Sequence, residues 1–568
     1  MQNGPGIQFY PADTSDVVAQ AIQRLHHNQV VSRIWSRDYT LWSRHPDEVL
    51  NRLGWLKITD TMQPQLDDII ALAEELQSEG MKDVVILGMG GASLVAEVFA
   101  DVFGSSHSGI RGTVLDSTHP AAIRSLHRSL DLSKTIFIFS MKKWALETFS
   151  LFKYFHAAMI ESVGQDQAGQ HFITITDVGA WVLPYAKQMN FRHIICNDPY
   201  CGGRYAALTH VGLVPAALYG IDIRKLLARA ENALNRCQEA TIKPQDNLGA
   251  WLGAVLGGLA ESGRDKLVFF ASPSLRSWLT WVEQLIAEST GKRSRGILPV
   301  IAPPDSKFEF YGRDCVFVVL EDSSSFSGFM AGFAGADQPV IHIQLQDIYD
   351  LGAQFVFWEF AIAVAGHILQ IHPFDQPDVE ATKIETSRLL EGYKQTGELS
   401  QPQPIMQDEI VTAYGHDTGA ALDDVISHFL SQLYNGDYLA IQAYLPPEAA
   451  TTSLLQDMQA QLQVLSHCAT TIAYGPRFLH SSGQLHKGDA GKGHFIQITN
   501  TIADDLSIPP LSEFDQDELR FATLLAAQAS GDWNALETRN RHILRLHIDG
   551  TIQQGLEQIL TICKSLRK

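Results

Sequence analysis

The sequence has little cysteine, a deficit of positive charge and no long uncharged apolar run. Its 568 residues include six cysteines, none in a C-x-x-C pair, so neither a disulfide framework nor a paired-cysteine metal or redox motif is expected. Asp and Glu outnumber Lys and Arg by 63 to 43, which gives a net charge of −20. A field of that sign repels phosphate and argues against a general role in binding nucleic acid or an anionic membrane.

Targeting signals are also missing. The first residues, MQNGPGIQFYPADTSD, contain no basic segment followed by an apolar one, so no signal peptide is predicted. Because no run of about 18 uncharged apolar residues occurs, no membrane-spanning helix is expected either. The few unpaired cysteines suit a reducing compartment, and a cytoplasmic protein is the simplest interpretation.

The residues that are present indicate a folded protein of several domains. The chain is 45% hydrophobic and 19% charged, as folded proteins are, and its length predicts about two to four domains. Residues 1–80 are expected to be mainly helical. Short apolar runs then alternate with helical stretches, and the expected strands are 84–88, 113–116, 135–140, 171–177 and 193–198, followed by 266–273, 297–301, 316–322 and 339–345.

Buried runs alternating with helices are typical of βαβ units, which form parallel sheets covered on both faces. We therefore expect an α/β fold with two doubly wound domains and a C-terminal mixed or helical extension that ends in a helical tail (515–566). The expected boundaries are a helical segment at 1–80, a first domain at 81–240, a second domain at 241–400 and the extension at 401–568.

Ligands of such folds bind at the carboxyl ends of the strands, and two motifs follow strands of the first domain. GMGGAS (88–93) allows close backbone approach to a ligand, or is simply a tight turn whose glycines serve packing. In NDPYCGGRY (197–205), Arg204 follows paired glycines and could present its planar guanidinium to an anion or a developing enolate oxygen. The alternative is an arginine paired with a structural carboxylate.

Three later segments carry further candidate residues. Glu288, in ESTGK (288–292), could be a general base or a solvated helical glutamate, and Lys383, in FDQPDVEATK (374–383), could be catalytic or lie on a solvated face. The segment YGPRFLHSSGQLHKG (474–488) gathers Arg477, His480, His486 and Lys487 among glycines. Its histidine spacing does not match a metal site, so we favour a structural or substrate-covering loop.

In this order, GMGGAS, GGRY, ESTGK and FDQPDVEATK resemble the glucose-6-phosphate isomerase family. YGPRFLHSSGQLHKG, with SRIWSRDYTLWS (32–43) and NRLGWL (51–56), is similar to the isomerase portion of bifunctional transaldolase/glucose-6-phosphate isomerase fusions. The resemblance covers roughly residues 20–560. It implies two sugar isomerase (SIS) domains and a glycolytic and gluconeogenic enzyme that interconverts glucose 6-phosphate and fructose 6-phosphate through a cis-enediol, without metal or cofactor.

The resemblance also implies a role for each matching residue. Glu288 would shuttle the proton between C2 and C1, Arg204 would stabilise the enediolate, and Lys383 would help to open the sugar ring. The partner would be a small sugar phosphate; a homodimer and a separate transaldolase are left open as further partners. The residues expected to bind the substrate are Gly90, Gly91, Ser93, Ser140, Lys142, Lys143, Thr148, Gly203 and Gln376.

The phosphate-binding loop departs from the family pattern. The family's S-K-S-G-T-T-L-E-T aligns with SMKKWALET (140–148), so the loop lysine has become Met141, and its middle serine, its glycine and both threonines are replaced. The first serine of the glycine-rich turn is Ala92, and Asp337 and Gln338 occupy a turn where related sequences often carry a ring-opening histidine. Each lost charge-assisted contact with phosphate would cost about 1.5–3 kcal/mol.

Three functions fit this combination. The first is a working isomerase in which Lys142 and Lys143 replace the lost phosphate contacts. The second is a catalytically impaired pseudo-isomerase that binds a sugar phosphate or a partner protein. The third is an isomerase of another sugar, without phosphate, on which Trp144 stacks. We favour the first, because the residues for the C1–C2 end of the sugar are retained.

Overall fold

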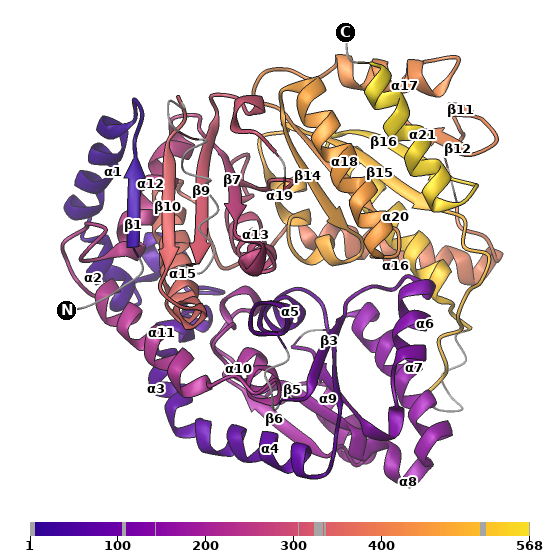
Figure 1. Cartoon of the computed structure of the whole chain (residues 1–568), viewed down its shortest axis with the longest axis horizontal. Coiled ribbons are helices and arrows are strands. Elements are labelled where there is room, and N and C mark those ends of the chain that lie inside the picture. Colours follow the sequence, from indigo (N-terminus) through magenta and orange to yellow (C-terminus); the bar gives the residue numbers. More distant parts are fainter. Residues whose placement is uncertain are drawn as a thin grey trace.

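Three β-sheets, each covered by helices, make up the protein (Figure 1). The structure is a computed structural model that describes residues 6–104, 109–142, 144–304, 306–322, 333, 337–400, 402–511 and 518–566. Lys143 therefore lies outside the described residues. Helices α5 (Gly91–Phe103) and α19 (Gly483–Gly488) both pack against α13 (Trp278–Thr290), between the three sheets (Figure 1).

The first sheet is entirely parallel, with the strand order β3-β2-β4-β5-β6. Its strands are β2 (Asp83–Leu87), β3 (Arg111–Leu115), β4 (Thr135–Ser140), β5 (Phe172–Asp177) and β6 (His193–Asn197). Alternate residues of β2 enter different cores: Val84 and Ile86 pack with the helices that face the second sheet, and Val85 and Leu87 pack on the opposite face. The helices facing the second sheet are α4 (Leu66–Ser78), α5 and α10 (His210–Leu218), and those opposite are α6 (Pro120–Ser129), α7 (Leu146–Val163) and α9 (Val182–Gln188).

The second sheet repeats this plan, with the order β1-β10-β9-β7-β8. Its parallel strands are β7 (Lys266–Ala271), β8 (Leu298–Ile301), β9 (Cys315–Asp322) and β10 (Val340–Leu345), and β1 (Gly6–Tyr10) is added antiparallel to β10. The core that it shares with the first sheet contains α11 (Ile223–Cys237), α12 (Leu248–Glu261), α13 and α15 (Leu351–Ile368).

Helix α15 is long and apolar enough to cross a membrane by length and composition, as part of the segment Ile348–Ile368. Of that segment's most apolar window, 94% is buried inside the protein. Burial among other helices explains its composition, because a helix enclosed on all sides is apolar all round. It is a core helix.

The third sheet is mixed, with the order β11-β12-β16-β15-β13-β14. Its strands are β11 (Met406–Gln407), β12 (Val411–Tyr414), β13 (Tyr438–Ala443), β14 (Ala469–Tyr474), β15 (Gly493–Asn500) and β16 (His542–Ile548). One face packs against the second sheet, where Tyr438 and Phe495 share a core with Phe270 and Phe317. The helices of this part are α16 (Val379–Thr396), α17 (Leu422–Ser431), α18 (Ala449–Ser466), α19, α20 (Phe521–Glu537) and α21 (Ile552–Ser565).

The nine strands expected in the two doubly wound domains are all present, each within two residues of the expected bounds. The N-terminal segment is mainly helical as expected, and two local details differ from the expectations. The N-terminal segment is helical in α1 (Ser15–His27), α2 (Val30–Trp35), α3 (Ile58–Met62) and α4, but residues 6–10 form the strand β1. The expected helical tail (515–566) is divided by the strand β16. In β16, Leu544 and Leu546 face one side of the third sheet and Ile543 faces the other, as alternate residues of a strand do.

Candidate functional site

A cavity of about 200 Å³ lies at the carboxyl ends of the strands of the first sheet. It is lined by residues at the end of β4 and in the segments that follow β2, β4 and β6: Gly91, Ser140, Lys142, Thr148 and Gly203. Gln376 and Lys383 complete it from the segment that begins α16, and His480 reaches it from the third part of the chain. The structure thus brings seven of the predicted site residues to one cavity wall.

The glycine-rich turn has no room for side chains. Gly90 has a φ of 62°, and a Cβ atom there would lie 2.9 Å from Nε2 of Gln284. A Cβ atom on Gly91 would lie 2.1 Å from the carbonyl oxygen of Gly203. Ser93 is fully buried and its hydroxyl donates to the Gly90 carbonyl and to Asp116, at 3.1 Å in each case. The turn therefore holds two predicted site segments in contact, while Ser93 points into the protein.

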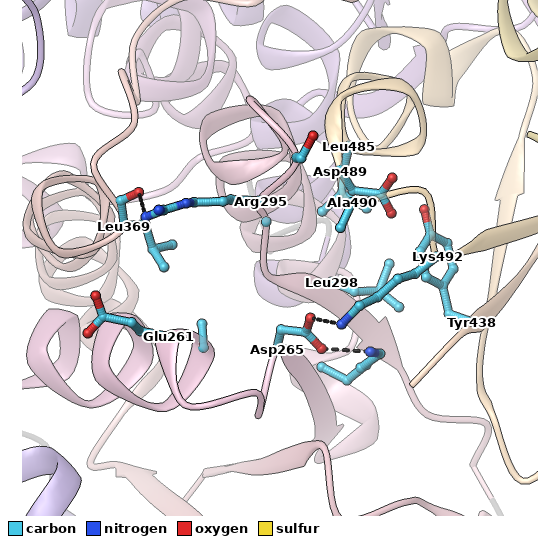
Figure 2. Close-up of a pocket in the computed structure, with 14 residues that line it drawn as sticks. Glu261, Asp265, Arg295, Leu298, Leu369, Tyr438, Leu485, Asp489, Ala490 and Lys492 are labelled. Atoms are coloured by element: carbon cyan, nitrogen blue, oxygen red, sulfur yellow. Dashed lines mark hydrogen bonds and ion pairs between the residues drawn. The ribbon is translucent and has the colours of Figure 1, made fainter. Parts of the chain in front are cut away.

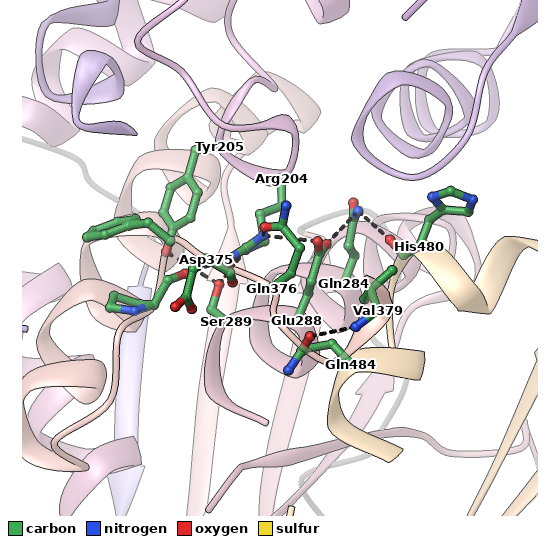
Figure 3. Close-up of polar contacts among 12 residues, drawn as sticks. Arg204, Tyr205, Gln284, Glu288, Ser289, Asp375, Gln376, Val379, His480 and Gln484 are labelled. Carbon is green, nitrogen blue, oxygen red and sulfur yellow. Dashed lines mark hydrogen bonds and ion pairs between the residues drawn. The ribbon is translucent and has the colours of Figure 1, made fainter. Parts of the chain in front are cut away.

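Arg204 and Glu288 form a buried ion pair beside this cavity. Nη1 of Arg204 lies 3.0 Å from Oε1 of Glu288, and both residues are less than a tenth exposed. Gln284, one helical turn before Glu288 on α13, donates from Nε2 to Oε2 of Glu288 at 3.1 Å and to the carbonyl of His480 at 2.8 Å. Figure 3 shows Gln284 between Glu288 and His480. The carboxylate is thereby fixed by contacts to both of its oxygens.

Two buried cations shape the loop that carries Gln376. Arg204 donates to the carbonyls of Pro373 (2.8 Å) and Asp375 (2.9 Å) and to Oε1 of Gln376 (3.2 Å). Lys292 pairs with the Asp375 carboxylate at 2.9 Å and donates to backbone carbonyls of the same loop. Burial, together with the charge of Arg204, lowers the pKa of Lys292 to about 8. Charge-assisted contacts on its inner side therefore hold this loop in place where regular secondary structure is missing.

Lys142 of the altered phosphate loop is already engaged by the protein. Its ammonium group lies 2.9 Å from Oδ2 of Asp177 and donates to the carbonyls of Pro199 (2.8 Å) and Cys201 (3.1 Å). A lysine has three N–H donors, so these contacts use all of them. Lys142 consequently joins the ends of β4, β5 and β6, and a phosphate would have to displace one of its partners.

The rest of the altered loop is packed with apolar groups. Met141 is buried, and its sulfur accepts a hydrogen bond from the backbone N–H of Ala145 at 3.2 Å. The ring of Trp144 is half exposed and packs on Trp181 and Phe149, with centroids 4.7 and 4.8 Å away. Trp144 also lines the cavity. An aromatic wall stands where the family pattern has hydroxyl groups.

Lys383 lies in the second turn of α16 and lines the cavity. Its side chain is 41% exposed, and its only described ion pair is a long one of 3.8 Å with Glu380. A loosely held ammonium group of this kind can move to meet a ligand, because its side chain is not fixed by other contacts.

His480 pairs with Glu147, a contact that no sequence motif predicts. Nε2 of His480 lies 3.3 Å from Oε1 of Glu147, which also accepts from Nε2 of Gln528 at 2.8 Å. Burial alone would raise the pKa of Glu147, but the hydrogen bond and charge of His480 outweigh it and lower that pKa to about 2. Glu147 lies at the end of the altered loop, and His480 lies in FLHSSG (478–483). The two segments are far apart in the sequence, so no local pattern predicts that these side chains pair.

A larger cleft of about 300 Å³ lies elsewhere, between the second and third sheets (Figure 2). None of the predicted site residues lines it. Its charges neutralise one another: Asp265 pairs with Lys266 at 2.6 Å and with Lys492 at 2.8 Å. Within the part of the chain that the structure describes, no three His, Cys, Asp or Glu side chains are grouped to hold a metal.

The chain is similar to known isomerases in part of its sequence. A family model described as phosphoglucose isomerase matches residues 57–296, the span that holds Arg204 and Glu288. Glucose-6-phosphate isomerase of Streptococcus gordonii is 26% identical over 394 residues, covering 60% of this chain and 86% of that protein. The enzyme of the same name from Mycoplasmopsis pulmonis is 27% identical over 390 residues, covering 60% of this chain and 90% of its own.

Solved structures agree on the fold. A glucose-6-phosphate isomerase from Chlamydia trachomatis superposes with a TM-score of 0.59 at 15% identity, over 68% of this chain and 89% of its own. A hypothetical protein from Thermus thermophilus gives a TM-score of 0.58 at 22% identity, over 68% of this chain and 100% of its own. These structures show the fold, and the sequence match together with the shared order of motifs supports the phosphoglucose isomerase family for this chain.

Proposed function

We propose that the protein is an aldose-ketose isomerase that interconverts glucose 6-phosphate and fructose 6-phosphate. The observation that carries the proposal is the buried pair of Arg204 and Glu288, 3.0 Å apart, beside a cavity of about 200 Å³ that their neighbours Gly203 and Gln376 line. A carboxylate can act as the base that removes a proton next to a carbonyl group. A fixed guanidinium beside it can stabilise the negative charge that then develops on the carbonyl oxygen.

In the proposed reaction Glu288 takes the proton from C2 of the aldose and returns it to C1, through a cis-enediol. The Arg204 guanidinium would stabilise the enediolate oxygens, because hydrogen bonds to Ser289 and the 373–376 loop fix its position. Lys383 and His480, both on the cavity wall, would transfer the proton that opens the ring. Glu147 orients the His480 imidazole, as a carboxylate does for a catalytic histidine.

A coupled assay with fructose 6-phosphate tests the proposal. Wild type should convert the substrate, and Glu288→Gln should lose at least about 10²-fold of kcat, the usual contribution of a positioned general base. Glu391→Gln, at an exposed position of α16, is the matched control and should keep full activity. Equal rates for wild type and Glu288→Gln would contradict the assignment.

One observation favours the pseudo-isomerase as a second candidate. The three contacts of Lys142 leave this residue without a donor for phosphate. If that holds for the bound state, a sugar phosphate would bind weakly and turn over slowly. A rate near the uncatalysed one, together with saturable binding of fructose 6-phosphate, would support this second candidate. A homodimer, a separate transaldolase partner and a cytoplasmic location stay predictions from the sequence.

A further inference from the structure

A second cavity, of about 620 Å³, lies near the candidate active site. We call it the rear cavity, and we call the cavity of about 200 Å³ the front cavity. The rear cavity is enclosed by α5, α13 and β8 on one side and by α18, β14 and the 477–486 segment of the third part on the other. Its volume is within the range of small-molecule sites, about 300–1,000 Å³. None of the residues expected to catalyse the reaction or to bind the substrate lines it, but Arg477 and His486 of the 474–488 segment do.

Two elements, α5 and the turn Arg477–His480, line both cavities, and α13 connects the rear cavity to the Arg204–Glu288 pair. On α13, Glu283 lines the rear cavity, whereas its neighbour Gln284 holds Glu288 at the candidate active site. In the short turn Arg477–His480, Arg477 lines the rear cavity and His480 lines the front one. Helix α5 likewise begins at the front and passes the rear cavity with its second and third turns. A change in the rear cavity therefore reaches groups that position Glu288 and His480.

Negative charge is in excess around the rear cavity. Its wall holds the carboxyl groups of Glu97, Asp101 and Glu283 and the guanidinium groups of Arg276 and Arg477. Arg477 is shared between Glu97 (2.8 Å) and Asp116 (2.6 Å), a carboxylate beyond the wall. Arg276 donates to a backbone carbonyl, that of Ala302, at 2.9 Å.

Burial is the main influence on the pKa of two carboxyl groups of this wall. Burial, and next the charge of Glu97, raise the pKa of Asp101. Burial raises the pKa of Glu283 to about 7, although Ser482 and Arg477 act in the opposite direction. A cation placed between these carboxyl groups would relieve both effects.

Two residues of this wall also carry buried polar atoms without a hydrogen-bond partner among the described residues. His486 is 1% exposed and lines the cavity, and its Nε2 has no hydrogen-bond partner among the described residues. Oε2 of Glu97 has none there either. Buried polar groups are nearly always paired, so the wall holds hydrogen-bonding capacity that the described residues do not use. The remaining wall is apolar, with Leu455, Ile472 and Phe478 among its residues.

We propose that the rear cavity binds a small molecule that carries an ammonium or guanidinium group on an apolar body, and that this ligand regulates the front site. The cation pairs with Glu283 and Asp101, and the apolar body packs on the wall contributed by α18 and β14. The ligand acts through the Arg477–His480 turn and through α13. Binding is independent of the proposed isomerase function, whereas the kinetic effect rests on it.

Thermal unfolding with benzylamine, isoamylamine and agmatine tests the binding step, because a ligand of the folded state raises Tm in a saturable way. Benzyl alcohol and benzoate are the neutral and anionic controls of the same size. We expect at least one amine to raise Tm saturably, and the two controls to have no such effect. Equal shifts with benzyl alcohol, or no shift with any amine, would overturn the site.

Variants locate the binding step. Glu283→Gln should weaken amine binding at least about tenfold in calorimetric titration. If Glu283→Gln does not fold, Asp101→Asn is used in its place and should weaken binding by the same factor. Glu231→Gln, at an exposed position of α11, should bind as wild type does. Undiminished binding by the folded cavity variant would overturn the assignment to this cavity.

Steady-state kinetics with fructose 6-phosphate test the regulatory step. A saturating amine should change kcat/KM at least twofold in wild type and leave Glu283→Gln unchanged. Unchanged wild-type kinetics at full occupancy would overturn regulation while leaving the binding site in place. A protein that binds the amine but has no isomerase activity would instead count against the proposed function.

Discussion

Nε2 of His480 lies 3.3 Å from Oε1 of Glu147, although 333 residues separate them in the chain. The pair joins the third part of the chain to the remnant of the phosphate loop, and both residues line a lobe adjoining the front cavity, beside Lys383. The proposed isomerase takes its ring-opening group from this pair. The related turn before β10 holds Asp337 and Gln338, which offer no imidazole.

Replacement of His480 by Asn should slow ring opening and leave proton transfer intact. We expect kcat with fructose 6-phosphate to fall about 10²-fold or more, as for loss of a general acid–base group. With 5-deoxyfructose 6-phosphate, which lacks the hydroxyl that closes the ring, the rate of His480→Asn should match that of wild type. Coupled assays on both substrates measure this difference.

Glu288→Gln is the control for that experiment, because it should lose activity on both substrates. If His480→Asn loses as much activity on the open-chain substrate as on fructose 6-phosphate, His480 has another role. Far-ultraviolet circular dichroism and Tm confirm that each variant is folded.

Arg204 should be needed for both activity and stability. Arg204→Met leaves the buried Glu288 carboxylate without its cation and removes the hydrogen bonds to the 373–376 loop. Breaking a buried ion pair from one side costs about 3–5 kcal/mol, so urea unfolding should show a loss of that size. Arg204→Lys should recover part of the stability and little of the activity, because a point charge cannot replace the planar contacts.

The control for Arg204 is Arg388→Met, which removes an exposed helix pair with Glu385. Exposed pairs contribute about 0–1 kcal/mol, so this variant should unfold like wild type. A small effect of Arg204→Met, comparable to that of Arg388→Met, would show that the buried contacts are dispensable.

Lys142 can be tested as a structural group rather than a phosphate ligand. Lys142→Met should raise KM for fructose 6-phosphate, because it leaves the Asp177 carboxylate unpaired on the cavity wall. The double variant Lys142→Met/Asp177→Asn removes both charges and should return KM to within about threefold of wild type. This non-additivity is expected for residues that act through each other.

If Lys142 contacts the phosphate directly, KM should not recover in the double variant. In that case the double variant stays as impaired as Lys142→Met, since the lost ligand is not replaced. The same pair of variants therefore decides whether the altered loop still recognises phosphate through this lysine.

The strands were predictable from the sequence because buried parallel strands are short apolar runs between helices. The strand β1 was not, because its five residues are stabilised by pairing with β10, more than 300 residues away. Arg204 and Glu288 were predictable as candidate site residues, because each lies in a recognisable motif and has a side chain suited to the reaction. The structure places them 3.0 Å apart. The partners of Lys142 and His480 come from distant loops, so no local pattern could show that these side chains are already engaged.

Acid should weaken the contribution of Glu147 to stability. Its pKa is about 2 in the folded protein against an ordinary value of 4.5, so the folded state favours the ionised form. The contribution is complete above pH 4.5 and is lost as the pH falls from 4.5 toward 2. A shift of that size corresponds to about 3 kcal/mol.

Urea unfolding of wild type and Glu147→Gln measures this contribution at pH 7, 5, 4 and 3.5. The difference in unfolding free energy between the two proteins should be constant from pH 7 to pH 5 and shrink below it. The sign follows from linkage: the unfolded chain binds a proton at a pH where the folded chain does not, so lower pH favours unfolding. Wild type and Glu391→Gln, an exposed carboxyl on α16, should show a nearly constant difference. A constant difference for Glu147→Gln as well would mean that His480 does not hold the Glu147 carboxylate in its ionised form.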